Sequence, residues 1–141
     1  KGKVSEGDII RFAVNYKNEI DLIRVIYDAN EDDFSGTTAL LSNFGAASRP
    51  VVGKLYNFAN NIVQIADADA DINSSFNLAQ TESYPIGNAV IVVYDKEESK
   101  GNRVRTGKTT DLISYKMASG KCSKVLVDSY QGTARVFVVF K

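Results

Sequence analysis

The chain has 141 residues, of which 44% are apolar, so it is long enough to bury a core and to form one domain. It has no histidine and a single cysteine, and therefore lacks the commonest general base, the commonest metal ligand and any internal disulfide, so we expect no enzyme activity. The net charge is zero, but residues 1–94 carry −5 and residues 95–141 carry +5, an asymmetry that favours head-to-tail stacking of copies or attraction to a polyanion.

The first predicted element is a β-hairpin. Residues 8–15 alternate apolar and polar side chains, with Ile10, Phe12 and Val14 on the face expected to lie against a core. The chain then turns, and residues 20–27 return as the second strand. We assign residues 1–28 to an N-terminal β-hairpin that could complete a module upstream of it.

The middle of the chain begins with a polar, acidic and glycine-bearing stretch at residues 29–50, which we interpret as a connection. The main β-domain is assigned to residues 51–141. Its first hairpin pairs strands at 51–56 and 62–65 around Asn60 and Asn61, which suit the positive backbone angles of a tight turn. A short strand is expected at 76–78, and the β-branched run at 89–94 is expected to be a central strand, buried on both faces.

The C-terminal region, residues 104–140, has the most regular pattern. It predicts a strand from Val104, a short helix near residues 110–116 capped by Thr109 or Thr110, strands at 124–128 and 134–140, and a glycine turn between them. Short strands with frequent turn signals are typical of all-β proteins. We therefore predict a small barrel or sandwich built from consecutive hairpins, with one short helix.

Three alternating carboxylates form a candidate calcium site. In an extended strand, Asp67, Asp69 and Asp71 would share one face and could bind calcium together with other oxygen ligands. An EF-hand loop that began at Asp67 would need glycine at its sixth position and glutamate at its twelfth. These positions are occupied by Ile72 and Leu78. A solvated acidic loop is the alternative.

Five basic side chains follow the predicted strand at 89–94 and form a candidate polyanion-binding site. They could contact phosphates, teichoic acid or an acidic glycan, although Glu97 and Glu98 weaken the positive potential. No aromatic residue lies between Tyr94 and Tyr115, so specific nucleic-acid binding is not expected, and a solvent-exposed loop is the alternative. The five residues are Lys96, Lys100, Arg103, Arg105 and Lys108.

Two stretches carry a resemblance to a known class of protein. One is the stretch of residues 4–15, which begins with the pattern Ser-x-Gly-Asp-hydrophobic-hydrophobic at Ser5 and is followed by Glu19-Ile20-Asp21-Leu22-Ile23, and the other is the pattern of residues 104–140. In these stretches the chain resembles the β-rich modules of Firmicute S-layer-type cell-surface proteins, which often carry S-layer homology anchors. The resemblance implies a secreted, modular protein at the extracellular cell surface.

We therefore expect a non-enzymatic structural module of a cell-surface layer or filament, acting in self-assembly or as a spacer. The expected partners are other copies, neighbouring modules of the same surface protein and cell-wall polymer. No membrane span is expected, because no apolar run approaches the ~20 residues that one requires. The alternatives are a binding module for anionic cell-wall polymer or glycan, and a phage virion structural domain.

Overall fold

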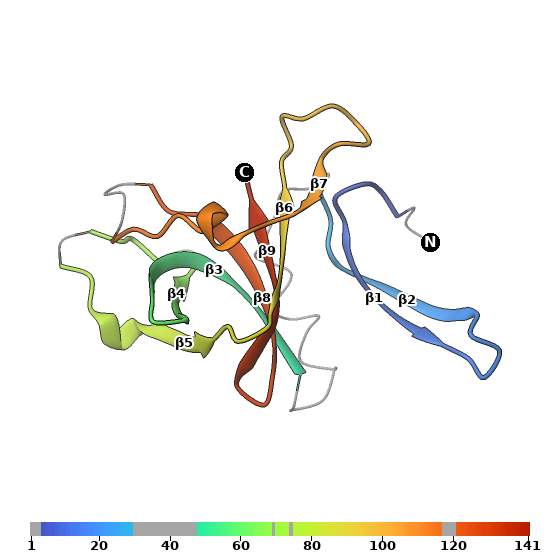
Figure 1. The fold of residues 1–141 in the computed structure, drawn as a ribbon, viewed down its shortest axis with the longest axis horizontal. Helices are drawn as coiled ribbons and strands as arrows, with labels where there is room; N and C mark the ends of the chain where they lie inside the picture. Colours follow the sequence, from blue (N-terminus) through green and yellow to red (C-terminus); the bar gives the residue numbers. More distant parts are fainter. Residues whose placement is uncertain (1–3, 30–47, 69, 74, 117–120) are drawn as a thin grey trace.

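The computed structural model describes residues 4–29, 48–68, 70–73, 75–116 and 121–141, which form an all-β, sandwich-like fold (Figure 1). Within these ranges nine strands form two sheets. The strands are β1 (Ile9–Val14), β2 (Ile20–Tyr27), β3 (Ser48–Ala59), β4 (Ile62–Asp67), β5 (Thr81–Pro85), β6 (Val90–Tyr94), β7 (Val104–Thr106), β8 (Lys124–Tyr130) and β9 (Thr133–Phe140). The fold class predicted from the sequence is confirmed.

The two sheets differ greatly in size. β1 and β2 form an antiparallel pair of their own, and the other seven strands form one sheet in the order β5-β4-β3-β8-β9-β6-β7. Within the larger sheet β6 and β9 run parallel, whereas the other neighbours are antiparallel. Strands adjacent in sequence pair in β3–β4, β4–β5, β6–β7 and β8–β9, so consecutive hairpins supply most of the sheet, as predicted.

Two tight turns carry the backbone angles that their residues favour. Asn60 and Asn61 join β3 to β4 with φ of 53° and 58°, and Gln131 and Gly132 join β8 to β9 with φ of 50° and 79°. Positive φ at both central residues is the conformation of two-residue hairpin turns, in which asparagine and glycine are the least strained. The predicted turns at both places are confirmed.

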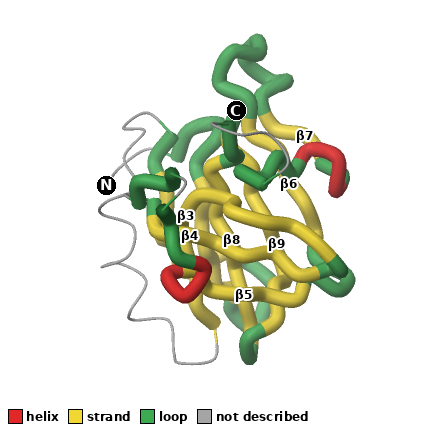
Figure 2. The backbone as a smooth tube through the Cα atoms, turned by 90° about the vertical axis from the view of Figure 1, so that its left-hand side faces the viewer, coloured by secondary structure: helices red, strands yellow, loops and turns green. Residues whose placement is uncertain are grey.

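The larger sheet bends round on itself, so that β5 comes to lie against β9 (Figure 2). Its inner face encloses the main core, in which Leu55, Val93 and Phe137 are fully buried. Leu112, from the segment before β8, packs into the same core. The expected barrel or sandwich is thus a sharply curved sheet that the described strands do not close into a ring.

The outer face of the same sheet is covered in part by the base of the N-terminal hairpin. Tyr94, Leu126 and Val138 are buried there. They pack against Ile9 and Ala29 at the base of the hairpin and against neighbours on the sheet itself, which are Val52, Val92, Val136 and Phe140. β8 and β9 are therefore covered on both faces, which accounts for their nearly continuous apolar sequences.

Among the described residues, no helix has the length and apolar character needed to cross a membrane.

The predicted helix at 110–116 is wrong. At this place the structure has a 3₁₀ turn at Thr109–Asp111, which ends at Leu112 in an extended conformation, and Tyr115 and Lys116 form a turn. Tyr115 donates its backbone N–H to the carbonyl of Leu55 (3.0 Å), and Lys116 donates to that of Tyr56 (3.1 Å). The amides that a helix would satisfy internally are thus bound to β3, so tertiary pairing overrides the local helix signal.

Other expected elements also need correction. The strand expected at 76–78 is absent; a 3₁₀ turn at Leu78–Gln80 follows and leads into β5, which the sequence analysis missed. β6 pairs on both sides but is not central, because only the three-residue β7 lies beyond it. Residues 30–47 of the predicted connection lie outside the described part of the chain, which resumes with Ser48 in β3.

Candidate functional site

The N-terminal hairpin, β1 and β2 together, is called the ribbon here, and its base is bound to the larger sheet. The Asp8 carboxylate accepts hydrogen bonds from the backbone N–H groups of Ser5 (2.7 Å) and Ala29 (2.9 Å), which closes the chain where it enters and leaves the ribbon. Beside it, the Glu6 carboxylate accepts the N–H of Gly101 at 2.7 and 2.9 Å. Asp8 therefore closes the base of the ribbon, and Glu6 connects that base to the loop after β6.

An aromatic cluster packs beneath this base. Tyr27 of β2 is 2% exposed, and its ring lies edge-on to that of Phe140, with centroids 4.7 Å apart. Phe140 meets Tyr94 in a second edge-on contact at 6.2 Å. Gly7 runs so close to the Tyr94 ring that an added Cβ would lie 2.6 Å from Tyr94 Cζ. A side chain at position 7 would thus collide with the surface on which the ribbon rests.

Beyond its base the ribbon projects from the rest of the molecule (Figure 1). The register pairs Phe12 with Ile23 and Val14 with Ile20, so these four side chains lie on one face of the ribbon. Their exposed fractions are 58%, 44%, 52% and 56%. The expectation that the face of Phe12 and Val14 lies against a core is wrong for these two residues. Alternation alone could not reveal this, because the pattern does not say which surface covers the apolar face.

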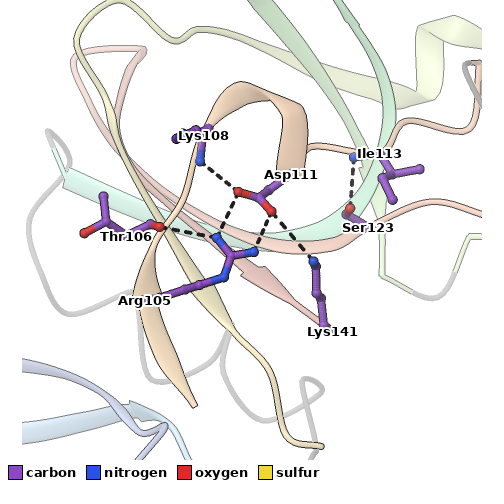
Figure 3. Close-up of polar contacts among 7 residues, drawn as sticks. All are labelled: Arg105, Thr106, Lys108, Asp111, Ile113, Ser123 and Lys141. Atoms are coloured by element: carbon purple, nitrogen blue, oxygen red, sulfur yellow. Dashed lines mark hydrogen bonds and ion pairs between the residues drawn. The ribbon is translucent and has the colours of Figure 1, made fainter. Parts of the chain in front are cut away.

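The predicted basic loop contains one strong ion pair, shown in Figure 3. Arg105 donates two hydrogen bonds to the carboxylate of Asp111, at 3.1 and 2.6 Å, and Lys108 donates its backbone N–H at 2.9 Å. The Nζ of Lys141 lies 3.7 Å from the same carboxylate. The hydrogen bonds from Arg105 and Lys108 hold the pKa of Asp111 far below its usual range. Asp111 thus ties β7 to the 3₁₀ turn and to the residue after β9.

We expect Asp111→Asn to lower the urea midpoint of unfolding at pH 7. Because the pKa of Asp111 is lowered in the folded state, its contribution to stability is present above the unfolded pKa of about 3.9 and is lost as the pH falls through the folded pKa. The difference between wild type and variant should therefore narrow below about pH 3.9. Glu97→Gln, which removes an exposed carboxylate, is the control. A difference in urea midpoint between wild type and Asp111→Asn that stays constant with pH would contradict the stabilising role of the Asp111 carboxylate.

The other members of the predicted polyanion site do not converge on one point. Arg103 donates from Nε to the carbonyl of Glu98 (3.0 Å), within its own loop. Lys96, Lys100 and Lys108 are exposed. Arg103 and Arg105 are therefore engaged by the chain itself, and the set is a loop rich in cations rather than a formed pocket.

The predicted calcium site is described only in part. Asp67 ends β4, and Asp71 lies four residues later in a loop, where its carboxylate accepts a hydrogen bond from the side chain of Asn73 (3.2 Å). Asp69 lies outside the described residues. Among the side chains that the structure does describe, no group of three or more could hold a metal ion. Calcium binding by the three carboxylates stays a prediction.

A cleft of about 490 Å³, which could not be predicted from the sequence, opens beside β3 and the start of β8. Its walls are held by backbone pairing, since Ser123 donates its N–H to the carbonyl of Ile113 (2.7 Å) and Ile113 donates to Ser123 Oγ (3.1 Å; Figure 3). Its lining includes Lys54, Ile72, Ile113, Tyr115, Lys121 and Cys122. Lysines and apolar side chains together suit a ligand that is both aromatic and acidic.

Cys122 is the only thiol of the chain and lines this cleft. Burial raises the pKa of the Cys122 thiol above its usual range, and the charge of Lys54 opposes this only in part. At neutral pH the thiol therefore stays protonated and is a poor nucleophile.

No protein-family model, curated protein or solved structure matches the chain.

Proposed function

We propose that this chain is a non-enzymatic structural module that assembles through its ribbon, as part of an extracellular cell-surface layer or filament. The observation that carries the proposal is the exposed apolar face of the ribbon, formed by Phe12, Val14, Ile20 and Ile23. Contiguous apolar side chains on a surface are typical of sites that contact another protein.

The ribbon gains stability from a partner for two physical reasons. A hairpin of two strands is marginally stable in water unless its face or its edge is covered. In the described part of the chain, β1 and β2 pair only with each other, so the outer edge of each strand offers backbone groups to a neighbouring strand. A neighbouring copy that covers the ribbon would satisfy both requirements.

The placement at a cell surface rests on the resemblance of residues 4–15, 19–23 and 104–140 to S-layer-type modules. Assembly through a projecting hairpin is compatible with that setting and with the virion alternative, since both build repeating arrays from one chain. The lack of histidine, the protonated Cys122 thiol and the internally paired Arg105 all favour a structural role over catalysis.

The test is to measure the sedimentation coefficient across a range of protein concentrations. Wild type should form species larger than the monomer as the concentration rises, and the double variant Phe12→Ser, Ile23→Ser should remain monomeric, because its ribbon no longer gains from burial of apolar surface. The expected loss of association is at least tenfold in Kd.

The matched control is Leu78→Ser, which removes an apolar side chain of similar exposure (50%) that is not on the ribbon. It should associate as wild type does. A wild-type chain that sediments as a monomer at every concentration, or a ribbon variant that associates like the control, would contradict the proposal.

A further inference from the structure

We propose that the cleft beside β3 receives the turn of the ribbon from a second copy of this chain, so that copies join head to tail. This inference rests on the proposed function and names the surface that the ribbon binds. The turn comprises residues 15–19, between β1 and β2. The cleft is the one lined by Lys54, Tyr115 and Lys121, among others.

The turn presents an aromatic side chain on a backbone that hydrogen bonds hold in place. Tyr16 is 91% exposed, the largest exposed fraction among the large hydrophobic side chains of the described residues. Around it, the side-chain oxygen of Asn15 accepts the backbone N–H groups of Lys17 (2.8 Å) and Glu19 (3.1 Å). Because the loop is already ordered, its binding costs less conformational entropy than that of a flexible segment, and tyrosine is a frequent anchor in interfaces.

The cleft has the size and lining to accept such a side chain. Its volume of about 490 Å³ lies within the range of about 300–1,000 Å³ that is usual for binding pockets. Ile72, Ile113 and Tyr115 supply apolar contacts. The site is preformed, because Tyr115 is paired to β3 and the amine of Lys54 is held by the carbonyl of Ala70 (2.7 Å).

The charges of the two surfaces are complementary. The turn and the start of β2 carry two carboxylates, Glu19 and Asp21, and one amine, that of Lys17, which lies 5.6 Å from the centre of the Tyr16 ring. The cleft is lined by three lysines, Lys54, Lys121 and Lys141, against one carboxylate, Asp71. The same polarity runs through the whole chain, because residues 1–94 carry −5 and residues 95–141 carry +5. Such complementarity favours binding in one orientation.

The turn of one copy does not reach its own cleft. In Figure 1 the turn between β1 and β2 lies at one side of the molecule, whereas the loop after β4 and the segment that leads into β8, which line the cleft, lie at the other side. The contact is therefore between copies and joins two different surfaces. Contacts of this kind form rings or open filaments rather than closed two-fold dimers.

Mixing two variants tests the inference by sedimentation. Tyr16→Ser removes the anchor, and Ile113→Ser with Lys121→Glu alters the cleft. Each variant alone should remain monomeric under conditions where wild type forms larger species. An equimolar mixture should form a 1:1 dimer and nothing larger, because one intact turn and one intact cleft remain between the two proteins.

A covalent test does not depend on changes to the cleft. In Tyr16→Cys, the introduced thiol should form an intermolecular disulfide with Cys122 of a second copy, with oxidised glutathione as the oxidant that is reduced as the two thiols are oxidised. The reaction is run at alkaline pH. A ladder of linked oligomers is expected, and adding Cys122→Ser should abolish it, because each chain then has a single thiol and its cleft offers none. Thr133→Cys, at an exposed position far along the chain from the turn, is the control and should give no ladder.

The outcomes separate this inference from the proposed function. If wild type assembles and the ribbon variant Phe12→Ser, Ile23→Ser does not, but the cleft variant assembles normally and Tyr16→Cys gives no ladder, then the ribbon mediates assembly and the cleft is not its acceptor. If wild type never assembles, both are overturned. A 1:1 dimer from the mixture, together with the ladder, supports both.

Discussion

Replacing Phe137 by alanine should lower the free energy of unfolding by about 3–5 kcal/mol, the usual cost of removing a buried phenylalanine side chain. Phe137 is 0% exposed and is the largest of the fully buried side chains in the described core. It lies on β9 opposite Val127 of β8 and Ile91 of β6, so its ring contributes to packing at the junction of the antiparallel and parallel parts of the sheet. The loss should appear as a shift in the urea midpoint, measured by circular dichroism.

Thr133→Ser on the same strand is the control, because Thr133 is exposed and its replacement removes one methyl group. Its free energy of unfolding should stay within about 0.5 kcal/mol of the wild-type value. If Phe137→Ala changed the free energy of unfolding as little as Thr133→Ser, the core would not be centred where the curved sheet places it.

The parts of the fold that the sequence predicts are those decided by neighbours in the chain. Asn60 and Asn61 favour the left-handed backbone that a two-residue turn needs, and alternation on either side of them defines the two strands. The same reasoning gives the ribbon and the β8–β9 hairpin. These hairpins form locally, so their signals do not depend on the rest of the molecule.

The parts that the sequence does not predict are decided by distant contacts. β6 pairs in parallel with β9, and the two strands are separated in the chain by β7 and β8, so no local pattern indicates the pairing. The segment from Leu112 to Lys116 reads as a helix but binds the edge of β3 through its amides. Local propensity is a weak prior in such a case, and tertiary hydrogen bonds decide the outcome.

The candidate sites also depend on contacts between residues that are distant in the sequence. The sequence shows a cluster of cations, but not that Arg105 is bound to Asp111, because that pair forms only when β7 and the 3₁₀ turn are both in place. The exposure of Phe12 and Ile23 depends on where the ribbon leaves the sheet. The cleft is lined by residues from Lys54 to Lys141, so only the folded chain could reveal it.

Gly7→Ala should release the ribbon from the larger sheet while leaving that sheet folded. Gly7 has φ of +98°, which a residue with a Cβ rarely adopts, and the added Cβ would lie 2.6 Å from Tyr94 Cζ and 2.9 Å from Cβ of Ala29. Strain of this kind costs about 1–3 kcal/mol. Detachment of the ribbon base relieves it, so the amides of β1 and β2 should exchange with solvent deuterium about 10- to 100-fold faster, whereas those of β8 and β9 keep their protection.

Gly132→Ala separates the backbone strain from the collision. Gly132 also has a positive φ, +79°, but an added Cβ there would meet nothing within 4 Å, and it lies in the β8–β9 turn. Gly132→Ala should therefore destabilise only the β8–β9 hairpin, through backbone strain without a collision. Hydrogen exchange of the amides in β1 and β2 should be unchanged. Since the ribbon is held by Tyr27, Tyr94 and Phe140 packing beneath its base, normal protection of β1 and β2 in Gly7→Ala would mean that this aromatic cluster does not position the ribbon.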